Sequence, residues 1–176
     1  GAEEGRHFLS VKSNNILGIY DISAGDDNHW HLSGYDVSIL SGWHELAAVS
    51  SGGETRFYVD GEEVGSPVSY SLSSALKYIG NYYPFYYGGN QPGGMIDNLF
   101  IYNGAVKPNE RHLFGDQLIA FYDFNEGTGN NFIDNSGNGN NGIIHQTSWV
   151  LIPIELCDDL HACNSYSYYL DNSCDY

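Results

Sequence analysis

Residues 42–66, GWHELAAVSSGGETRFYVDGEEVGS, indicate the fold class. Two apolar runs of strand length, 43–50 and 55–60, follow each other, and the pair Asp60-Gly61 joins the second run to the short run EEV. An Asp-Gly pair accepts the positive φ angles that a tight hairpin turn needs, so the stretch predicts antiparallel strands. The alternation of side chains then predicts which residues face the core. They are Trp43, Leu46 or Ala47, Val49, Phe57 and Val59.

The rest of the chain repeats this pattern of short apolar runs separated by Gly, Asn or Ser turns. The runs are 7–12, 16–22, 29–37, 76–82, 95–102, 118–124 and 143–150. Only residues 107–114, KPNERHLF, predict a helical turn, because Pro108 stands near its start and Gly115 follows its end. Many short strands with almost no helix predict an all-β protein, an antiparallel β-sandwich of the jelly-roll type.

Composition narrows the choice of partners. A chain of 176 residues with 41% hydrophobic side chains is long and apolar enough for one globular core. Acidic residues outnumber basic ones 22 to 6, giving a formal charge of −16, so phosphate backbones and anionic membrane surfaces would be repelled. We therefore expect no nucleic-acid partner. No run approaches the roughly 18 apolar residues of a membrane span, so we expect no membrane insertion.

The C-terminal end differs from the rest of the chain. Cys157, Cys163 and Cys174 all fall in an acidic, tyrosine-rich stretch. Such a stretch is typical of an oxidising, extracellular environment, with one disulfide and one odd thiol among the three candidates. We therefore divide the chain into a β-sandwich domain, residues 1–150, and a Cys/Tyr-rich acidic tail, residues 151–176. The start at Gly1 favours a processed form or a piece of a longer protein.

Four motifs in order resemble a laminin G-like, concanavalin A-like jelly-roll domain. They are the tryptophan strand GWHELAAV, the hairpin YVDG, the strand YIGNYYP at 78–84, and GGMIDNLFIYNGAVKPNERHLF at 93–114. The resemblance covers residues 42–114, and less clearly reaches back to His7. It implies a lectin-like β-sandwich that works in extracellular recognition or adhesion.

The order of the motifs departs from the family pattern. Residues 1–117 resemble the second half of such a domain, whereas 118–150 resemble its first strands, with LIAFYDFNEGTGNNFIDNSGNGNNG at 118–142. Three explanations stay open. The chain spans parts of two tandem domains, or it is circularly permuted and closes on itself, or its late strands complete the next copy by strand exchange. The last explanation predicts a homo-oligomer or filament.

The loop IDNSGNGNNG, residues 133–142, is a candidate metal site. The resemblance implies that this loop and the closing Ile-Asp strand meet at a calcium ion held by Asp97, Asp134, Asn138 and Asn140. Calcium prefers six to eight oxygen ligands, which Asp and Asn side chains and backbone carbonyls can supply. Because the loop carries one carboxylate, it needs Asp97 or Asp123 to help. The alternative is that Asn and Gly only supply left-handed turn conformations, with the Asp and Ser of the loop making local side-chain bonds, and that Asp97 only caps its strand.

A tyrosine-rich stretch at 81–94, NYYPFYYGGNQPGG, is the candidate ligand-binding surface. Aromatic rings stack on sugar rings, and amide side chains bind hydroxyl groups. The candidate residues are Tyr82, Tyr83, Tyr86, Tyr87 and Asn90. The same tyrosines could instead pack against a neighbouring subunit.

Catalysis is not expected. Glycoside hydrolysis needs two carboxylates on one face, and no Glu-x-Asp-x-Glu array occurs. Adjacent pairs such as Asp26-Asp27 would point to opposite faces of a strand. The sequence therefore predicts a calcium-stabilised extracellular module that binds carbohydrate or protein. The alternative is a structural filament subunit assembled by β-strand exchange.

Overall fold

The computed structural model describes residues 6–21, 23, 29–72, 76–77, 79–80, 94–144 and 147–150. Its strands are antiparallel and its helices are short, as an antiparallel β-sandwich requires. The first three strands form one sheet, in the order β1 (Arg6–Val11), β2 (Ile16–Asp21) and β3 (Trp30–Asp36). The next three form a second sheet, in the order β4 (Leu46–Ser51), β5 (Glu54–Val59) and β6 (Glu62–Val68).

The hydrophobic core lies between these two sheets. Leu17 and Ile19 of β2 meet Phe57 of β5 and Val68 of β6, and all four are buried. Burying a side chain of this size contributes about 1.5–3 kcal/mol. Phe57 and Val59 are buried as predicted.

The predicted inward face of β4 is wrong in part. Leu46 and Ala48, rather than Val49, pack against the core, because they lie opposite Val59 and Phe57 in the ladder. Trp43 precedes the strand, and 53% of its surface is exposed. The strand therefore starts three residues later than its apolar pattern suggests.

Strands β3 and β6 approach each other closely at one glycine. A Cβ atom added to Gly65 would lie 2.5 Å from the carbonyl oxygen of Ser33. Gly65 also has a φ of +66°, which side chains rarely adopt. Ser33 itself donates a hydrogen bond from Oγ to the carbonyl of Leu17, so β2, β3 and β6 are locked together here.

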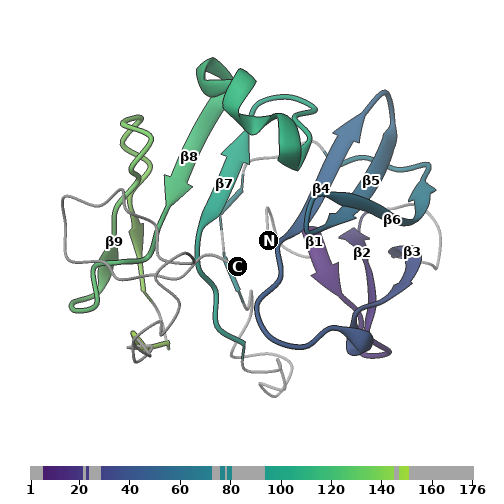
Figure 1. Ribbon diagram of the computed structural model, residues 1–176, viewed down its shortest axis with the longest axis horizontal. Coiled ribbons are helices and arrows are strands. Elements are labelled where there is room, and N and C mark those ends of the chain that lie inside the picture. Colours follow the sequence, from purple (N-terminus) through teal and green to yellow (C-terminus); the bar gives the residue numbers. More distant parts are fainter. Residues whose placement is uncertain are drawn as a thin grey trace, which may run out of the picture.

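A second group of strands lies beside the sandwich. Strand β7 (Leu99–Tyr102) pairs with β8 (Leu118–Tyr122), and β8 lies farther from β4–β6 than β7 does (Figure 1). Two short strands, β9 (Asn131–Phe132) and β10 (Gly142–Ile143), form a further pair. The segment that resembles the start of the family domain is thus paired with β7 of its own chain.

Several predicted boundaries change in this part. The helical turn is confirmed as the 3-10 helix η2 (Pro108–Leu113), which starts at the proline and is followed by η3 (Gly115–Gln117). The strand predicted at 95–102 begins only at Leu99, because Asn98 has a φ of 49° and interrupts the extended backbone. Of the strand predicted at 143–150, Ile143 lies in β10, and the described residues 144 and 147–150 are not in a strand. Within 76–82, the described residues 76–77 and 79–80 are not in a strand.

Helix η2 joins the two groups of strands. Arg111 forms a two-pronged ion pair with Glu45, which directly precedes β4, and its guanidinium lies 4.7 Å from the centre of the Phe100 ring in β7. Val106 and Pro108 are buried nearby. These contacts hold β7 and β8 beside the second sheet.

Candidate binding site

An exposed tryptophan marks a hollow on the surface of the sandwich. The segment between η1 (Val37–Ile39) and β4 presents Trp43, which lines an open hollow of about 310 Å³ together with Gly42, Gly94 and Met95. Met95 is 55% exposed. The hollow therefore combines an indole ring and a thioether with two stretches of backbone that carry no side chain.

The residues around Trp43 are fixed to the β5–β6 hairpin. The His44 ring lies with Nδ1 2.7 Å from Oδ2 of Asp60 and with Nε2 3.0 Å from the carbonyl oxygen of Ser41. Asp60 Oδ1 accepts a hydrogen bond from the backbone of Glu45, and the Asp60 backbone donates one back to the Glu45 carbonyl. Asp60 occupies the hairpin turn with a φ of 51°.

These contacts alter the acidity of both side chains. The hydrogen bonds to Asp60 and to the Ser41 carbonyl raise the pKa of His44. The hydrogen bonds from His44 and from the Glu45 backbone lower the pKa of Asp60. The protonated imidazole and the ionised carboxylate are therefore the favoured pair.

The hollow has the chemistry of a recognition surface. An indole ring can stack on the apolar face of a sugar or hold an apolar side chain of a protein. Gly42 and Gly94 allow a ligand to approach the backbone closely. The tyrosine-rich stretch runs directly into Gly94, but Tyr82, Tyr83, Tyr86, Tyr87 and Asn90 lie outside the described residues.

Asp134 lies at the centre of the loop that was predicted to bind calcium. Its side chain is buried, and Oδ1 accepts hydrogen bonds from the backbone of Phe121 and from the backbone and hydroxyl of Ser136, at 2.6–3.0 Å. Oδ2 accepts bonds from the backbone and side-chain amide of Asn140, at 2.9 and 3.2 Å. A carboxylate offers about four lone-pair positions, so these hydrogen bonds use all of its capacity to accept.

The loop forms the outer edge of β8. The backbone of Phe121 donates to Asp134 and accepts from Asn135, whereas β7 pairs on the other side of the strand. The side-chain amides of Asn138 and Asn140 cap carbonyls of Leu118 and Ile119 on the same edge. Asp97 instead precedes β7, where its oxygens accept bonds from Asn98.

The predicted calcium ligands therefore do not fit a single ion in this arrangement. Asp134, Asn138 and Asn140 come together, but their polar atoms bind one another and β8, and Asp97 belongs to the segment before β7, where its oxygens bind Asn98. Among the described residues, no group of three or more His, Cys, Asp or Glu is arranged to hold a metal. One nearby oxygen is left over, since Oε2 of Glu126 is buried without a hydrogen bond. Calcium binding, predicted from the sequence, is untested, and the hydrogen bonds within the loop predict instead that it keeps its shape without an ion.

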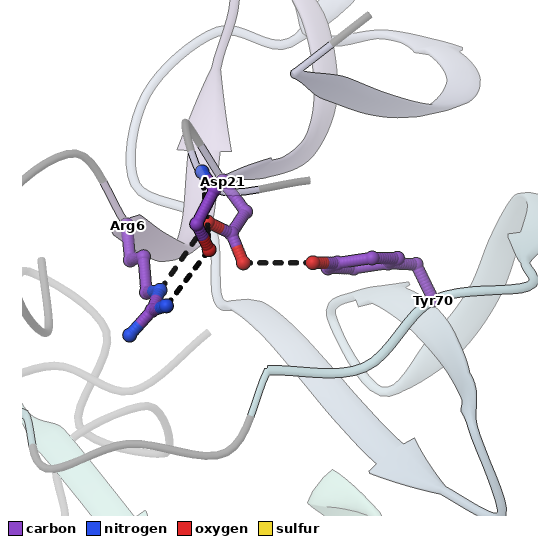
Figure 2. A network of polar contacts seen from close by, with 4 residues as sticks. Arg6, Asp21 and Tyr70 are labelled. Carbon is purple, nitrogen blue, oxygen red and sulfur yellow. Dashed lines mark hydrogen bonds and ion pairs between the residues drawn. The ribbon is translucent and has the colours of Figure 1, made fainter. Parts of the chain in front are cut away.

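A second buried carboxylate, that of Asp21, lies at the end of β2 in the first sheet. Figure 2 shows Asp21 between Arg6 and Tyr70, with the Tyr70 hydroxyl 2.7 Å from Oδ2 and Arg6 Nε 3.2 Å from Oδ1. Burial alone would raise the pKa of Asp21, but the hydrogen bonds from Ser23, Tyr70 and Arg6 outweigh it and lower the pKa to about 2. The Tyr70 ring stacks on His31 with 3.8 Å between centroids. This network ties the start of β1 to the segment after β6.

Sequence reasoning missed the two pairs that shape these regions. Trp43 was expected in the core, and Asp60 was assigned to its turn alone. Nothing in the sequence links Asp60 with His44, or Asp21 with Tyr70, because the partners belong to different strands or connections. The Asp-Gly turn was the one available signal, since it placed Asp60 at the end of the hairpin.

The fold and its family match indicate, in general, a module that binds carbohydrate or protein. A family model described as the concanavalin A-like lectin/glucanases superfamily matches residues 1–110. This is more than half of the chain, which therefore belongs to that superfamily. Laminin G-like domains are typically binding modules and are commonly extracellular, although the superfamily also includes glucanases. No curated protein and no solved structure matched the chain.

The match ends within η2, so β8 and the Asp134 loop lie outside it. The likeness of residues 118–142 to the start of a family domain stays an interpretation. The three cysteines, Cys157, Cys163 and Cys174, lie outside the described residues, and their pairing stays a prediction. Within the described part of the chain, no helix is long and apolar enough to cross a membrane.

Proposed function

We propose that this protein is an extracellular recognition module that binds glycan at the hollow beside Trp43, without catalysis. The observation that carries the proposal is the exposure of 53% of this tryptophan in a hollow of about 310 Å³. The indole of Trp43 exposes apolar surface to water unless a ligand covers it. Trp30, for comparison, packs against Tyr20 and Lys12.

Glycan suits this hollow better than an ionic ligand does. Among the described residues, those that line it, Gly42, Trp43, Gly94 and Met95, carry no charged side chain. A neutral sugar can stack its C–H face on the indole and direct its hydroxyls to the glycine backbone. The formal charge of −16 does not oppose a neutral sugar, but it would oppose a sulfated or otherwise anionic one.

A glycan array tests the proposal directly. The parent is compared with Trp43→Ala and with a variant in which Tyr82, Tyr83, Tyr86 and Tyr87 are all alanine. Ile39→Ala is the matched control, because Ile39 is an apolar residue that is 72% exposed but does not line the hollow. We expect Trp43→Ala to lose binding and Ile39→Ala to keep it. Binding by Trp43→Ala at parental strength would contradict the site, and loss only in the tyrosine variant would move it to residues 81–94.

A filament subunit is the second candidate. Strand β8 reaches β7 only after a long connection, and the same pairing could form between two copies of the chain. Ile119, Ile133 and Ile143 are 40–62% exposed along this segment. Light scattering on the parent and on a chain lacking residues 118–150 tests the idea. Assembly of the parent that is lost in the deletion would support the filament, whereas a monomeric parent would exclude it.

A further inference from the structure

The His44 ring contacts two hydrogen-bond acceptors. Its Nδ1 faces the carboxylate of Asp60 and its Nε2 faces the carbonyl of Ser41. A neutral imidazole has one N–H, so it can donate to only one of them. Both contacts are hydrogen bonds only when the ring carries two protons. The neutral ring must turn a lone pair toward one acceptor, which is repulsive.

The charges around the ring support the protonated form. Asp60 approaches from the β5–β6 hairpin and is the carboxylate that contacts His44. Glu45 is the next residue of the segment, but both of its oxygens bind Arg111 of η2. Asp60 is therefore the acidic partner of His44, and Arg111 is balanced by Glu45.

The ring also fixes the backbone on both sides of Trp43. The bond to Ser41 spans Gly42 and Trp43, two of the residues that line the hollow, and the bond to Asp60 ties the segment to the hairpin. Gly42 has a φ of +91° and nothing lies within 4 Å of its Cβ position, so this short stretch can change shape when the bond to Ser41 breaks.

We propose that His44 is a pH-sensitive latch: its protonated ring holds Trp43 in the binding hollow, and loss of a proton releases the Ser41 side and weakens binding. The binding consequence rests on the proposed function, whereas the release itself does not. Deprotonation keeps Nδ1–H on Asp60, the stronger acceptor, and leaves Nε2 facing the Ser41 carbonyl.

The direction of the pH effect follows from the two groups. The pKa of His44 is raised above its usual 6.5, so the latch is fully formed below about pH 6.5 and is lost as the pH rises through the higher folded value. The pKa of Asp60 is lowered, so its charge persists throughout this window. Each pH unit above the midpoint lowers the ratio of protonated to neutral His44 about tenfold.

Fluorine NMR of protein labelled with 5-fluorotryptophan tests the latch without any ligand. The Trp43 resonance, assigned with Trp43→Phe, is followed from about pH 5.5 to about pH 8.5. We expect it to shift with a midpoint above 6.5 in the parent, and not to shift in His44→Gln. In Asp60→Asn the midpoint should fall toward 6.5, because the carboxylate that favours the charged ring is gone. Trp149 serves as a fold control, since its indole donates to Gly129 in another part of the molecule.

A Trp43 resonance that is independent of pH, or that titrates alike in the parent and in His44→Gln, would overturn the latch. If the Trp149 resonance moves in His44→Gln, that variant is misfolded. The midpoint of the Trp43 resonance in Asp60→Asn then tests the latch. An unchanged midpoint in that variant also overturns the proposal. A latch that titrates in a protein that binds no glycan would leave the latch standing and remove the proposed function.

Discussion

At the scale of single residues, Asp134 explains why a loop of Asn, Gly and Ser has a defined shape. Its two oxygens accept five hydrogen bonds from Phe121, Ser136 and Asn140. Hydrogen bonds to a charged group contribute about 1.5–3 kcal/mol each in favourable cases, and they also fix the geometry of the donors. The Asp134 loop therefore forms hydrogen bonds with Phe121 on the edge of β8 that does not pair with β7, where a neighbouring strand would otherwise bind.

Replacing Asp134 with asparagine should destabilise the domain. One oxygen becomes an NH₂ group that faces N–H donors, so at least one buried donor loses its partner, at a cost of about 1–3 kcal/mol. Chemical denaturation of the parent and of Asp134→Asn measures the difference. Asp116→Asn removes the same charge at an exposed position of η3 and should change stability by less than about 0.5 kcal/mol. Equal stability of the two variants would refute the role of Asp134.

Acid should destabilise the fold through the two buried carboxylates. The pKa of Asp21 is lowered to about 2, and hydrogen bonds also hold the pKa of Asp134 well below its usual range. A lowered folded pKa means that the stabilisation is present above the usual 3.8 and is lost as the pH falls through the folded value. Asp21 accounts for roughly 1–2 kcal/mol after solvent screening.

Denaturant midpoints between about pH 5 and about pH 2 measure this loss. Asp21→Asn should flatten the pH dependence relative to the parent. A parental curve that stays level down to about pH 2 would show that neither carboxylate is linked to folding.

At the scale of elements, the close contact between β3 and β6 requires a glycine at position 65. Gly65→Ala would place a methyl group 2.5 Å from the Ser33 carbonyl and would also strain a left-handed backbone. Gly52→Ala is the matched control, because Gly52 has a φ of +59° with open space around it. The control should cost about 1–2 kcal/mol from strain alone.

Gly65→Ala should cost clearly more than this, on the order of 3 kcal/mol or above, because the clash adds to the strain. Thermal unfolding of both variants makes the comparison. If the two glycines prove equally tolerant, β3 and β6 do not pack as closely as the 2.5 Å approach between a Cβ at position 65 and the Ser33 carbonyl implies.

The strands themselves could largely be predicted from sequence. Alternating apolar residues gave β4, β5 and the Asp60 turn, because residues that alternate with period two can bury one face. The inward face of β4 could not be fixed in this way. Trp43, Leu46 and Val49 are all apolar, and only the pairing with Phe57 and Val59 shows that Leu46 and Ala48 face the core.

The site was predicted less well than the fold. From sequence, the IDNSGNGNNG loop was predicted to bind calcium, with local bonds of Asp and Ser as the alternative. The structure shows such local bonds between Asp134 and Ser136, whereas Asp97 precedes β7, the strand that pairs with β8. The exposed position of Trp43 depends on where β4 begins, and the His44–Asp60 contact joins residues that are 16 apart in sequence. Local patterns do not specify such contacts between elements.

At the scale of the whole molecule, the segment that resembles the start of the family domain lies next to the segment that resembles its end. Strand β8 pairs with β7, and η2 binds both Glu45 and Phe100, so the late part of the chain packs beside the sandwich (Figure 1). This arrangement is the one that circular permutation would produce, and we interpret it in that way. Strand exchange would require the same pairing between two chains.

Removal of calcium should leave the fold unchanged. The Asp134 loop is satisfied by its own donors, so excess chelator is expected to leave the unfolding temperature of the parent where it was. A drop in unfolding temperature that calcium restores would show an ion bound to the folded state. In that case, abolition of the effect in Glu126→Gln would locate the ion at Oε2 of Glu126, the one buried carboxylate oxygen without a donor in the described part of the chain.

The most direct test of the binding site follows the indole N–H signals of the protein while a glycan selected on the array is added. Trp43 lines the hollow, whereas the Trp149 indole donates to Gly129 and Trp30 packs against Tyr20. We predict that the Trp43 signal shifts in proportion to the bound fraction and that the other two stay in place. A fixed Trp43 signal during saturating glycan binding would contradict the account, because the ligand would then be bound elsewhere.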